Sequence, residues 1–141
     1  MSYWRLYYHF VWTTRDRQPQ IAPDIEAAIY QCLHQEAKAM YAPFFYVGGM
    51  ADHVHVVTAV RPALALADFV KQVKGSSSHF VTHELKRPFV WQKGYGVFSV
   101  SATTLDTVKA YVLNQKQHHH AQTLVVEWEE SHDWNLGPEE G

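Results

Sequence analysis

The order of strand-like and helix-like segments is the feature that most constrains the fold of this 141-residue chain. Residues 3–14 are dense in aromatic and β-branched side chains, which favours a strand, and a polar stretch ending at Pro19 follows them. Apolar residues then recur at helical spacing up to about residue 40, after a start at Pro23 and Asp24. Further along, the same patterns predict strands at 44–47, 53–60 and 97–102 and helices at about 66–85 and 105–117.

This order of elements predicts the architecture. Strand, helix, strand, strand, helix and strand form the ferredoxin-like (RRM-like) split βαβ sandwich. We therefore predict an α+β fold with a four-stranded, mainly antiparallel sheet and two helices packed on one of its faces. A C-terminal, tyrosine-bearing helix follows, and the other face of the sheet is left for a ligand or for this third helix.

Charge is distributed unevenly along the chain. Residues 1–120 hold all twelve Lys and Arg and eight acidic residues, whereas residues 121–141 hold six acidic residues and no Lys or Arg. We interpret 1–120 as one domain and 121–141 as an acidic tail, with 124–128 as a short strand or a docking segment. The body is modestly basic, and the tail can compete for a surface that binds an anionic partner. The overall charge of -2 therefore does not exclude nucleic acid as a partner.

The cysteine count and the hydropathy exclude several classes of protein. Cys32 is the single cysteine, which excludes an intramolecular disulfide framework and a zinc site with several Cys ligands. It lies in the apolar stripe of the first helix, where a thiol is buried and inert. No apolar run approaches the ~18–20 residues that cross a bilayer, and the N-terminus does not resemble a signal peptide. We expect a cytoplasmic protein with no membrane partner.

Two histidines are separated by one residue in the predicted strand at 53–60. Side chains at positions i and i+2 of a strand lie on the same side of the sheet, here about 6–7 Å apart. His53 and His55 can therefore meet one cation, while Val54 packs on the opposite side. Imidazole binds zinc, manganese and iron, and it can share a magnesium site with phosphate oxygens. The alternative is a pair of strand histidines that only hydrogen-bond to their neighbours.

The third predicted helix carries polar groups beside its apolar stripe. Tyr111 and Gln115 are four residues apart and emerge from one side of the helix, with Asn114 nearby. Lys109 and Lys116 interrupt the apolar stripe, which indicates a helix that is not wholly buried. A tyrosine and an amide in this position can face a ligand. A half-buried tyrosine beside a surface glutamine is the alternative.

The combination of these motifs resembles a known family. In chain order they are Tyr8-His9-Phe10-Val11-Trp12-Thr13-Thr14, Asp52-His53-Val54-His55, Lys71…Lys74-Gly75-Ser76-Ser77, Trp91…Gly94-Tyr95…Ser99-Val100 and Tyr111…Asn114-Gln115. Residues 3–117 thus resemble the single-tyrosine HUH transposases of insertion-sequence-200-like elements, where HUH denotes histidine, a bulky hydrophobic residue and histidine. His-Val-His alone has low specificity, but its order and spacing relative to Tyr-x-x-Asn-Gln make the combined match specific.

The resemblance implies a metal-dependent transposase that cleaves and rejoins single-stranded DNA through a 5′-phosphotyrosine intermediate. His53, His55 and Gln115 would be ligands of a divalent cation, Mg²⁺ or Mn²⁺, which polarises the scissile phosphate. Tyr111 would be the nucleophile, and the covalent intermediate would retain the bond energy needed to rejoin strands without ATP. Asp52 should point away from the pair on an undistorted strand, so we assign it no ligand role.

The resemblance also implies a partner and an assembly. The substrate in this family is single-stranded DNA, usually folded into a hairpin, and the proteins are prokaryotic. They typically form dimers in which the tyrosine helix completes the partner's active site, so we expect a homodimer that associates with the nucleoid when bound to DNA. Candidate DNA contacts, from one helical stripe and from loops, are Arg15, Arg17, Lys71, Lys74, Ser78, Trp91, Lys93 and Tyr95.

Other interpretations stay open. HIT-type nucleotide hydrolases use three alternating histidines on a strand, but the third position here is Val57. A non-catalytic single-stranded nucleic-acid-binding module on the same fold would shift a DNA hairpin without becoming linked to it. A structural protein with an adventitious metal would keep its metal uptake without Gln115. Two features of the sequence have no assigned role: Ser101-Ala102, where many family members carry glycines, and the run His118-His119-His120.

Overall fold

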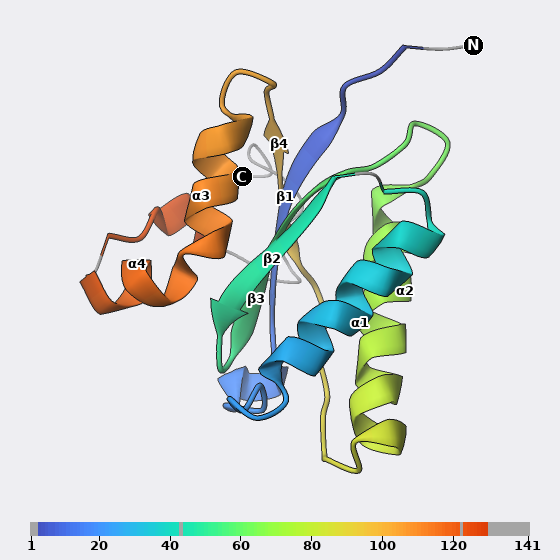
Figure 1. The fold of residues 1–141 in the computed structure, drawn as a ribbon, viewed down its shortest axis with the longest axis vertical. Helices are drawn as coiled ribbons and strands as arrows, with labels where there is room; N and C mark the ends of the chain where they lie inside the picture. Colours follow the sequence, from blue (N-terminus) through green and yellow to red (C-terminus); the bar gives the residue numbers. More distant parts are fainter. Residues whose placement is uncertain (1–2, 43, 122, 130–141) are drawn as a thin grey trace, which may run out of the picture.

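The computed structural model of the chain describes residues 3–42, 44–121 and 123–129, so residues 130–141 of the predicted tail lie outside the described residues. Four strands form one antiparallel sheet: β1 (Tyr7–Thr13), β2 (Phe45–Met50), β3 (His53–Ala59) and β4 (Gly96–Val100) (Figure 1). Their order is β2-β3-β1-β4, which puts β1 and β3 in the centre. The predicted ferredoxin-like α+β fold is confirmed.

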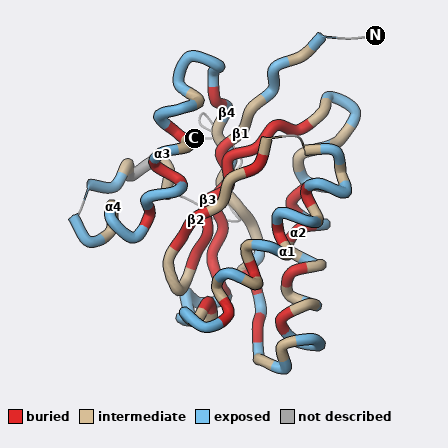
Figure 2. Tube along the Cα trace, in the orientation of Figure 1, coloured by how far each residue is buried: buried red, intermediate tan, exposed pale blue. Residues whose placement is uncertain are grey.

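Two helices cover one face of this sheet. They are α1 (Glu26–Ala39) and α2 (Leu66–His79), and a π-helical turn, η2 (Phe80–Glu84), extends the second (Figure 1). Because side chains alternate along a strand, every second residue of β1 and β3 faces these helices. Phe10, Trp12, Val54 and Val56 all belong to this main core and are fully buried. Figure 2 shows the resulting pattern, in which the central strands are buried and the outer faces of the helices are exposed.

The other face of the sheet is covered by the C-terminal elements α3 (Leu105–Leu113), α4 (Gln115–Ala121) and the 3-10 helix η3 (Val126–Glu129). A small apolar cluster that includes Val57 and Val112 holds α3 against the sheet. The prediction of one continuous helix over 105–117 was wrong, because Asn114 interrupts it with φ -107° and ψ 32°. The Asn114 side-chain amide donates to the Ala110 carbonyl oxygen at 2.8 Å, a local bond of the kind that favours helix ends.

The segment after α4 docks on the sheet, one of the two predicted outcomes, although it forms a 3-10 helix and not a short strand. The Trp128 ring lies edge-on to the rings of His9 and Tyr111, with centroid distances of 5.3 and 5.0 Å. Docking brings residues near the C-terminal end of the described chain onto the sheet face that carries His53 and His55. Within the described residues, no helix is long and apolar enough to cross a membrane.

Two glycines in β2 allow α3 to approach the sheet closely. The sequence predicts a strand over 44–47 with Gly48 and Gly49 as its end or a bulge, whereas the strand continues through both glycines to Met50. Gly48 lies opposite His55 in the ladder, and a Cβ atom at Gly48 would lie 2.0 Å from the Val112 carbonyl oxygen. Glycine within a strand often marks a site where another backbone comes close. Here the missing side chain sets how near α3, and with it Tyr111, lies to the histidine strand.

We therefore expect Gly48→Ala to destabilise the protein by about 2–3 kcal/mol, because the new methyl group must displace the backbone of α3. The free energy of unfolding in urea measures this effect. Gly75→Ala is the matched control, since nothing lies within 4 Å of a Cβ atom at this position in α2. That substitution should stabilise the helix by about 0.5–1 kcal/mol. Equal effects of the two substitutions would contradict the close packing of α3.

Candidate metal and nucleophile site

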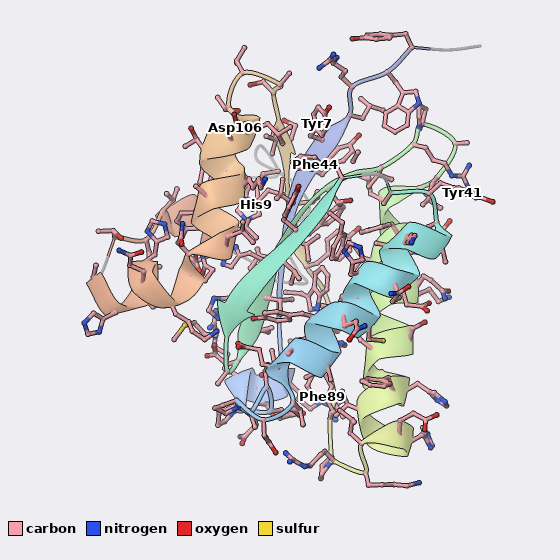
Figure 3. The ribbon with its side chains drawn as sticks, in the orientation of Figure 1. Tyr7, His9, Tyr41, Phe44, Phe89 and Asp106 are labelled. Atoms are coloured by element: carbon pink, nitrogen blue, oxygen red, sulfur yellow. The ribbon has the colours of Figure 1, made fainter. Side chains whose placement is uncertain are left out.

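Three histidines from the two central strands share the sheet face under α3. His53 and His55 alternate along β3 with residues of the main core, and His9 of β1 lies on the same face as His55. Their exposed fractions are 0–1%, so all three imidazoles are removed from solvent. Figure 3 shows His9 projecting from β1 into the space between the sheet and α3. The predicted same-side arrangement of His53 and His55 therefore exists, with a third histidine behind it.

Asp52 fixes the orientation of the His53 ring. Its Oδ1 lies 2.7 Å from His53 Nδ1, and its Oδ2 lies 3.2 Å from the Arg17 guanidinium. The hydrogen bond with His53 lowers the pKa of Asp52 to about 2, with a smaller contribution from Arg17, so the carboxylate is ionised and only accepts. His53 Nδ1 donates to this carboxylate, and the other ring nitrogen, Nε2, faces into the site. Asp52 was expected to point away from the histidine pair, but its carboxylate contacts the His53 ring and sets the orientation of that ring.

His9 contacts the Nδ1 atom of His55, as Asp52 contacts the Nδ1 atom of His53. The His9 Nε2 and His55 Nδ1 atoms are 2.8 Å apart, and both atoms lie in the buried layer between the sheet and α3. Burial lowers the pKa of His9 to about 3 and also lowers the pKa of His55, so both rings are neutral. The His9 Nδ1 atom has no hydrogen-bond partner among the described residues. His9 thus contacts the ring nitrogen of His55 that faces away from the site, and it holds that ring in position.

Tyr111 and Gln115 reach this histidine group from the helical side. The Tyr111 ring centroid lies 5.6 Å from that of His55, and Gln115 Oε1 lies 3.4 Å from His53 Nε2. Gln115 Nε2 donates to the Tyr111 carbonyl oxygen at 3.1 Å, which directs the amide oxygen toward the histidines. Both side chains are buried, with exposed fractions of 4% and 1%. The break at Asn114 lies between them, so they belong to different helices and still converge.

Glu129 of η3 lies among these groups. Its carboxylate accepts from the Tyr111 hydroxyl, and its oxygens lie 3.1 and 3.2 Å from His55 Nε2 and 3.5 Å from His53 Nε2. Burial alone would raise the pKa of Glu129, but hydrogen bonds with His55 and Tyr111 outweigh it and lower the pKa to about 2. Burial and the Glu129 contact together raise the pKa of Tyr111 to about 12. His53, His55 and Glu129 offer ligand atoms within 4.8 Å of one another, a group that can hold a metal ion.

The structure thus brings together His53, His55, Tyr111 and Gln115 within one chain. It also adds residues that the sequence reasoning did not place in the site, namely His9, Asp52 and Glu129. Alternation along β1 puts His9 on one face of the sheet, but only the register between β1 and β3 shows that this face is the one that carries His55. Glu129 is separated from Tyr111 by 18 positions, and no local pattern indicates it.

The predicted DNA-contact residues are dispersed. Arg15 and Arg17 are exposed on the 3-10 turn η1 (Arg15–Arg17), and Arg17 is linked to the site through Asp52. Lys71 and Lys93 are exposed, while the Ser78 hydroxyl donates to the Gly75 carbonyl oxygen of its own helix at 3.1 Å. Their contacts with DNA stay predictions.

Lys74, Trp91 and Tyr95 have packing roles in this structure. The Lys74 ammonium donates to two main-chain carbonyl oxygens in the loop before β4, at 2.7 and 2.9 Å, and burial lowers the pKa of Lys74 to about 8. Trp91 is 7% exposed and donates to the buried Ser77 hydroxyl at 2.9 Å. Tyr95 packs against the main core. All three positions stabilise the loop that leads into β4, and a role in DNA binding stays a prediction for each.

Comparison with known proteins places the chain in a family. The family model described as "Transposase IS200 like" matches residues 2–115. The chain belongs to the IS200-like transposase family. Membership assigns DNA transposition, with cleavage and joining of DNA, as its general activity. The matched range includes His53, His55, Tyr111 and Gln115, and it ends at the first residue of α4.

One relative and one solved structure are similar to this IS200-like transposase in sequence, and a second solved structure shares its fold. ISDra2 transposase TnpA of Deinococcus radiodurans is 27% identical over 119 residues, which span 79% of this chain and 85% of that protein. A crystal structure of a transposase from Deinococcus radiodurans R1 has a TM-score of 0.63 at 27% identity and covers 82% of this chain and 95% of that one. A tyrosine transposase bound to a REP hairpin shares the fold, with a TM-score of 0.61 at 15% identity, covering 93% and 82%.

Proposed function

We propose that this IS200-like transposase cleaves and rejoins single-stranded DNA through a 5′-phosphotyrosine intermediate and depends on a divalent cation. Tyr111 is the proposed nucleophile, and His53, His55 and Gln115 are the proposed cation ligands. The observation that carries the proposal is the convergence of all four side chains in one buried site of a single chain. A nucleic-acid-binding module without catalysis has no need for a tyrosine hydroxyl beside a histidine pair.

The residues present fit a divalent cation. His53 Nδ1 is engaged by Asp52, so Nε2 is the ring nitrogen that faces the site. The hydrogen bond from Gln115 Nε2 to the Tyr111 carbonyl oxygen directs Gln115 Oε1 at it. Imidazole nitrogens and an amide oxygen are accepted ligands of Mn²⁺ and related ions, and Mg²⁺ uses such a site together with phosphate oxygens and water. A bound cation would polarise the scissile phosphate and stabilise the departing 3′ oxygen.

The chain's own residues supply the covalent step. The Tyr111 oxygen attacks phosphorus, a tyrosine O–P bond forms, and the bond between phosphorus and the 3′ oxygen breaks. Tyr111 loses its phenolic proton, and the released 3′ oxygen takes up a proton to become a hydroxyl. Because one phosphoester replaces another, a 3′ hydroxyl can attack the phosphotyrosine in the reverse direction, and the strands rejoin without ATP.

Glu129 must leave before DNA can enter. A reacting phosphorus needs to lie about 3–3.5 Å from the attacking oxygen. The Glu129 carboxylate holds this space now, since it contacts both the Tyr111 hydroxyl and His55 Nε2. A carboxylate and a phosphate are both anions, so they compete for the same donors. The conformation described here is therefore a closed state in which η3 covers the nucleophile.

We expect Glu129→Gln to increase the rate of DNA linkage at sub-saturating DNA by about tenfold or more. A hydrogen bond to a charged group contributes about 1.5–3 kcal/mol, and each 1.4 kcal/mol corresponds to a factor of ten. The measurement is the initial rate of adduct formation at saturating Mn²⁺. Glu84→Gln, an exposed acidic residue on η2, removes the same charge elsewhere and should leave the rate unchanged. A slower reaction of Glu129→Gln would show that the carboxylate is required for the chemistry.

A DNA hairpin is the proposed partner, and a homodimer is the proposed assembly. The hairpin is supported by the related tyrosine transposase that is bound to a REP hairpin. The positive charge of residues 1–120 provides the general attraction to phosphate. The site residues meet within one chain in the present conformation, so a dimer is not needed to assemble them.

A covalent-capture experiment tests the proposed function. The protein is incubated with Mn²⁺ and a labelled hairpin library whose single-stranded flanks are randomised, then denatured and separated on a gel. We expect a labelled band of protein–DNA adduct that survives denaturation, and a modified peptide that contains Tyr111. DNA that is shifted on a native gel but never linked to the protein would instead support the non-catalytic binding module.

A further inference from the structure

His119 of α4 lies at the edge of the site, beyond the residues that the family model matches. Its Nε2 atom is 3.2 Å from His53 Nε2 and 3.2 Å from Gln115 Oε1. The same atom is 3.8 Å from a Glu129 carboxylate oxygen. His119 follows Gln115 by four positions, so the two side chains emerge from the same side of α4.

These separations match those between neighbouring ligands of one small cation. Ligand atoms about 2.0–2.2 Å from an ion lie roughly 3.0 Å apart at right angles and roughly 3.4 Å apart in a tetrahedron. The three distances among His53 Nε2, His119 Nε2 and Gln115 Oε1 are 3.2, 3.2 and 3.4 Å. Imidazole nitrogens and an amide oxygen are both accepted ligands of divalent cations.

Two of the groups around His119 Nε2 are oxygens that only accept hydrogen bonds, namely Gln115 Oε1 and the Glu129 carboxylate oxygen. The third is His53 Nε2, the ring nitrogen that faces the site, since His53 Nδ1 is engaged by Asp52. A cation in their midst would contact all of these groups at once.

We propose that His119 is a further ligand of the catalytic cation, so that His53, His55 and His119 supply three imidazoles together with the Gln115 oxygen. This inference rests on the proposed function. Imidazole suits first-row transition ions, whereas Mg²⁺ is bound mainly by oxygen ligands and water. The site therefore prefers a divalent transition ion to Mg²⁺, and α4 is tied to the sheet when the ion is bound.

Binding of Co²⁺ to the full chain, measured by calorimetry, tests the proposal without DNA. Loss of a residue that only supports a metal ligand costs about 10–100-fold in affinity, so His119→Ala should weaken Co²⁺ binding at least tenfold. His120→Ala is the matched control, because this neighbouring histidine is exposed on the same helix. The Co²⁺ affinity of the His120→Ala protein should stay within twofold of that of the unmodified protein. Mg²⁺ should compete for the site only at much higher concentration than Mn²⁺.

The number of bound imidazoles distinguishes a ligand from a residue with a structural role. Paramagnetic NMR of the Co²⁺ complex should show shifted ring protons from three histidines, and from two in His119→Gln, which keeps a hydrogen-bonding side chain. Three sets of signals in His119→Gln, or unchanged affinity in His119→Ala, would overturn the proposal. Covalent capture of DNA reports separately on the proposed function. If no adduct forms but Co²⁺ binding changes as expected, the assignment of His119 as a ligand stands and the proposed transposase chemistry is wrong.

Discussion

Tyr111→Phe is expected to abolish covalent linkage to DNA, with a loss of at least about a thousandfold in the rate of adduct formation. The substitution removes the oxygen atom that would form the O–P bond, while the buried ring is kept. The measurement is the denaturing gel with labelled hairpin DNA and Mn²⁺. DNA binding, measured on a native gel, should be retained or strengthened, because a phenylalanine ring has no hydroxyl to hold the Glu129 carboxylate in the site.

Tyr46→Phe is the matched control for this experiment. Tyr46 lies on β2 and packs against the same small apolar cluster as α3, so it shares the general surroundings of Tyr111. Removing its hydroxyl should leave adduct formation unchanged. A Tyr111→Phe protein that still forms the adduct at the normal rate would exclude Tyr111 as the nucleophile.

The second large effect is expected from the histidine pair. His53→Gln and His55→Gln should each lower cation affinity at least a hundredfold and reduce adduct formation below detection. Each substitution removes an imidazole ligand while it keeps a polar side chain in a buried position, where alanine would leave a cavity. Cation binding is measured by Co²⁺ titration, and chelation of the metal from the unmodified protein should reproduce the loss of activity.

His83→Gln provides the control for the histidine substitutions. His83 is exposed on η2, on the side of the molecule where α1 and α2 pack. Its replacement should change neither Co²⁺ affinity nor adduct formation. If His53→Gln and His55→Gln retained full cation affinity, the strand histidines would have only a packing role and the proposed metal site would be wrong.

The sequence predicted the parts of this fold that depend on local periodicity. Alternating and helical apolar spacing located four strands and the first two helices, because each pattern reflects which side of an element is buried. His53 and His55 were placed on one face for the same reason. The break at Asn114 was missed, because the spacing of apolar residues does not reveal the hydrogen bond that the Asn114 side chain donates to the Ala110 carbonyl oxygen at the helix end.

The site was predicted only in part, for a physical reason that the missed residues share. His9 contacts His55 through the β1–β3 register, and Glu129 reaches Tyr111 because η3 folds back onto the sheet. Asp52 precedes β3 and lies in the turn, where strand alternation does not apply, so its side chain bends toward His53. Each of these contacts joins residues whose relation depends on how elements pack or turn, and a periodic pattern contains no such information.

What the sequence by itself determined is the order of elements, the side of the sheet that carries the two strand histidines, and the presence of a tyrosine and an amide on a late helix. Tertiary structure alone decided how close α3 lies to β2, through Gly48, and which groups surround the histidines. It also decided that Glu129 now covers Tyr111. Burial patterns are local and survive in the sequence, whereas distances of about 3 Å between side chains depend on the packing of the whole chain.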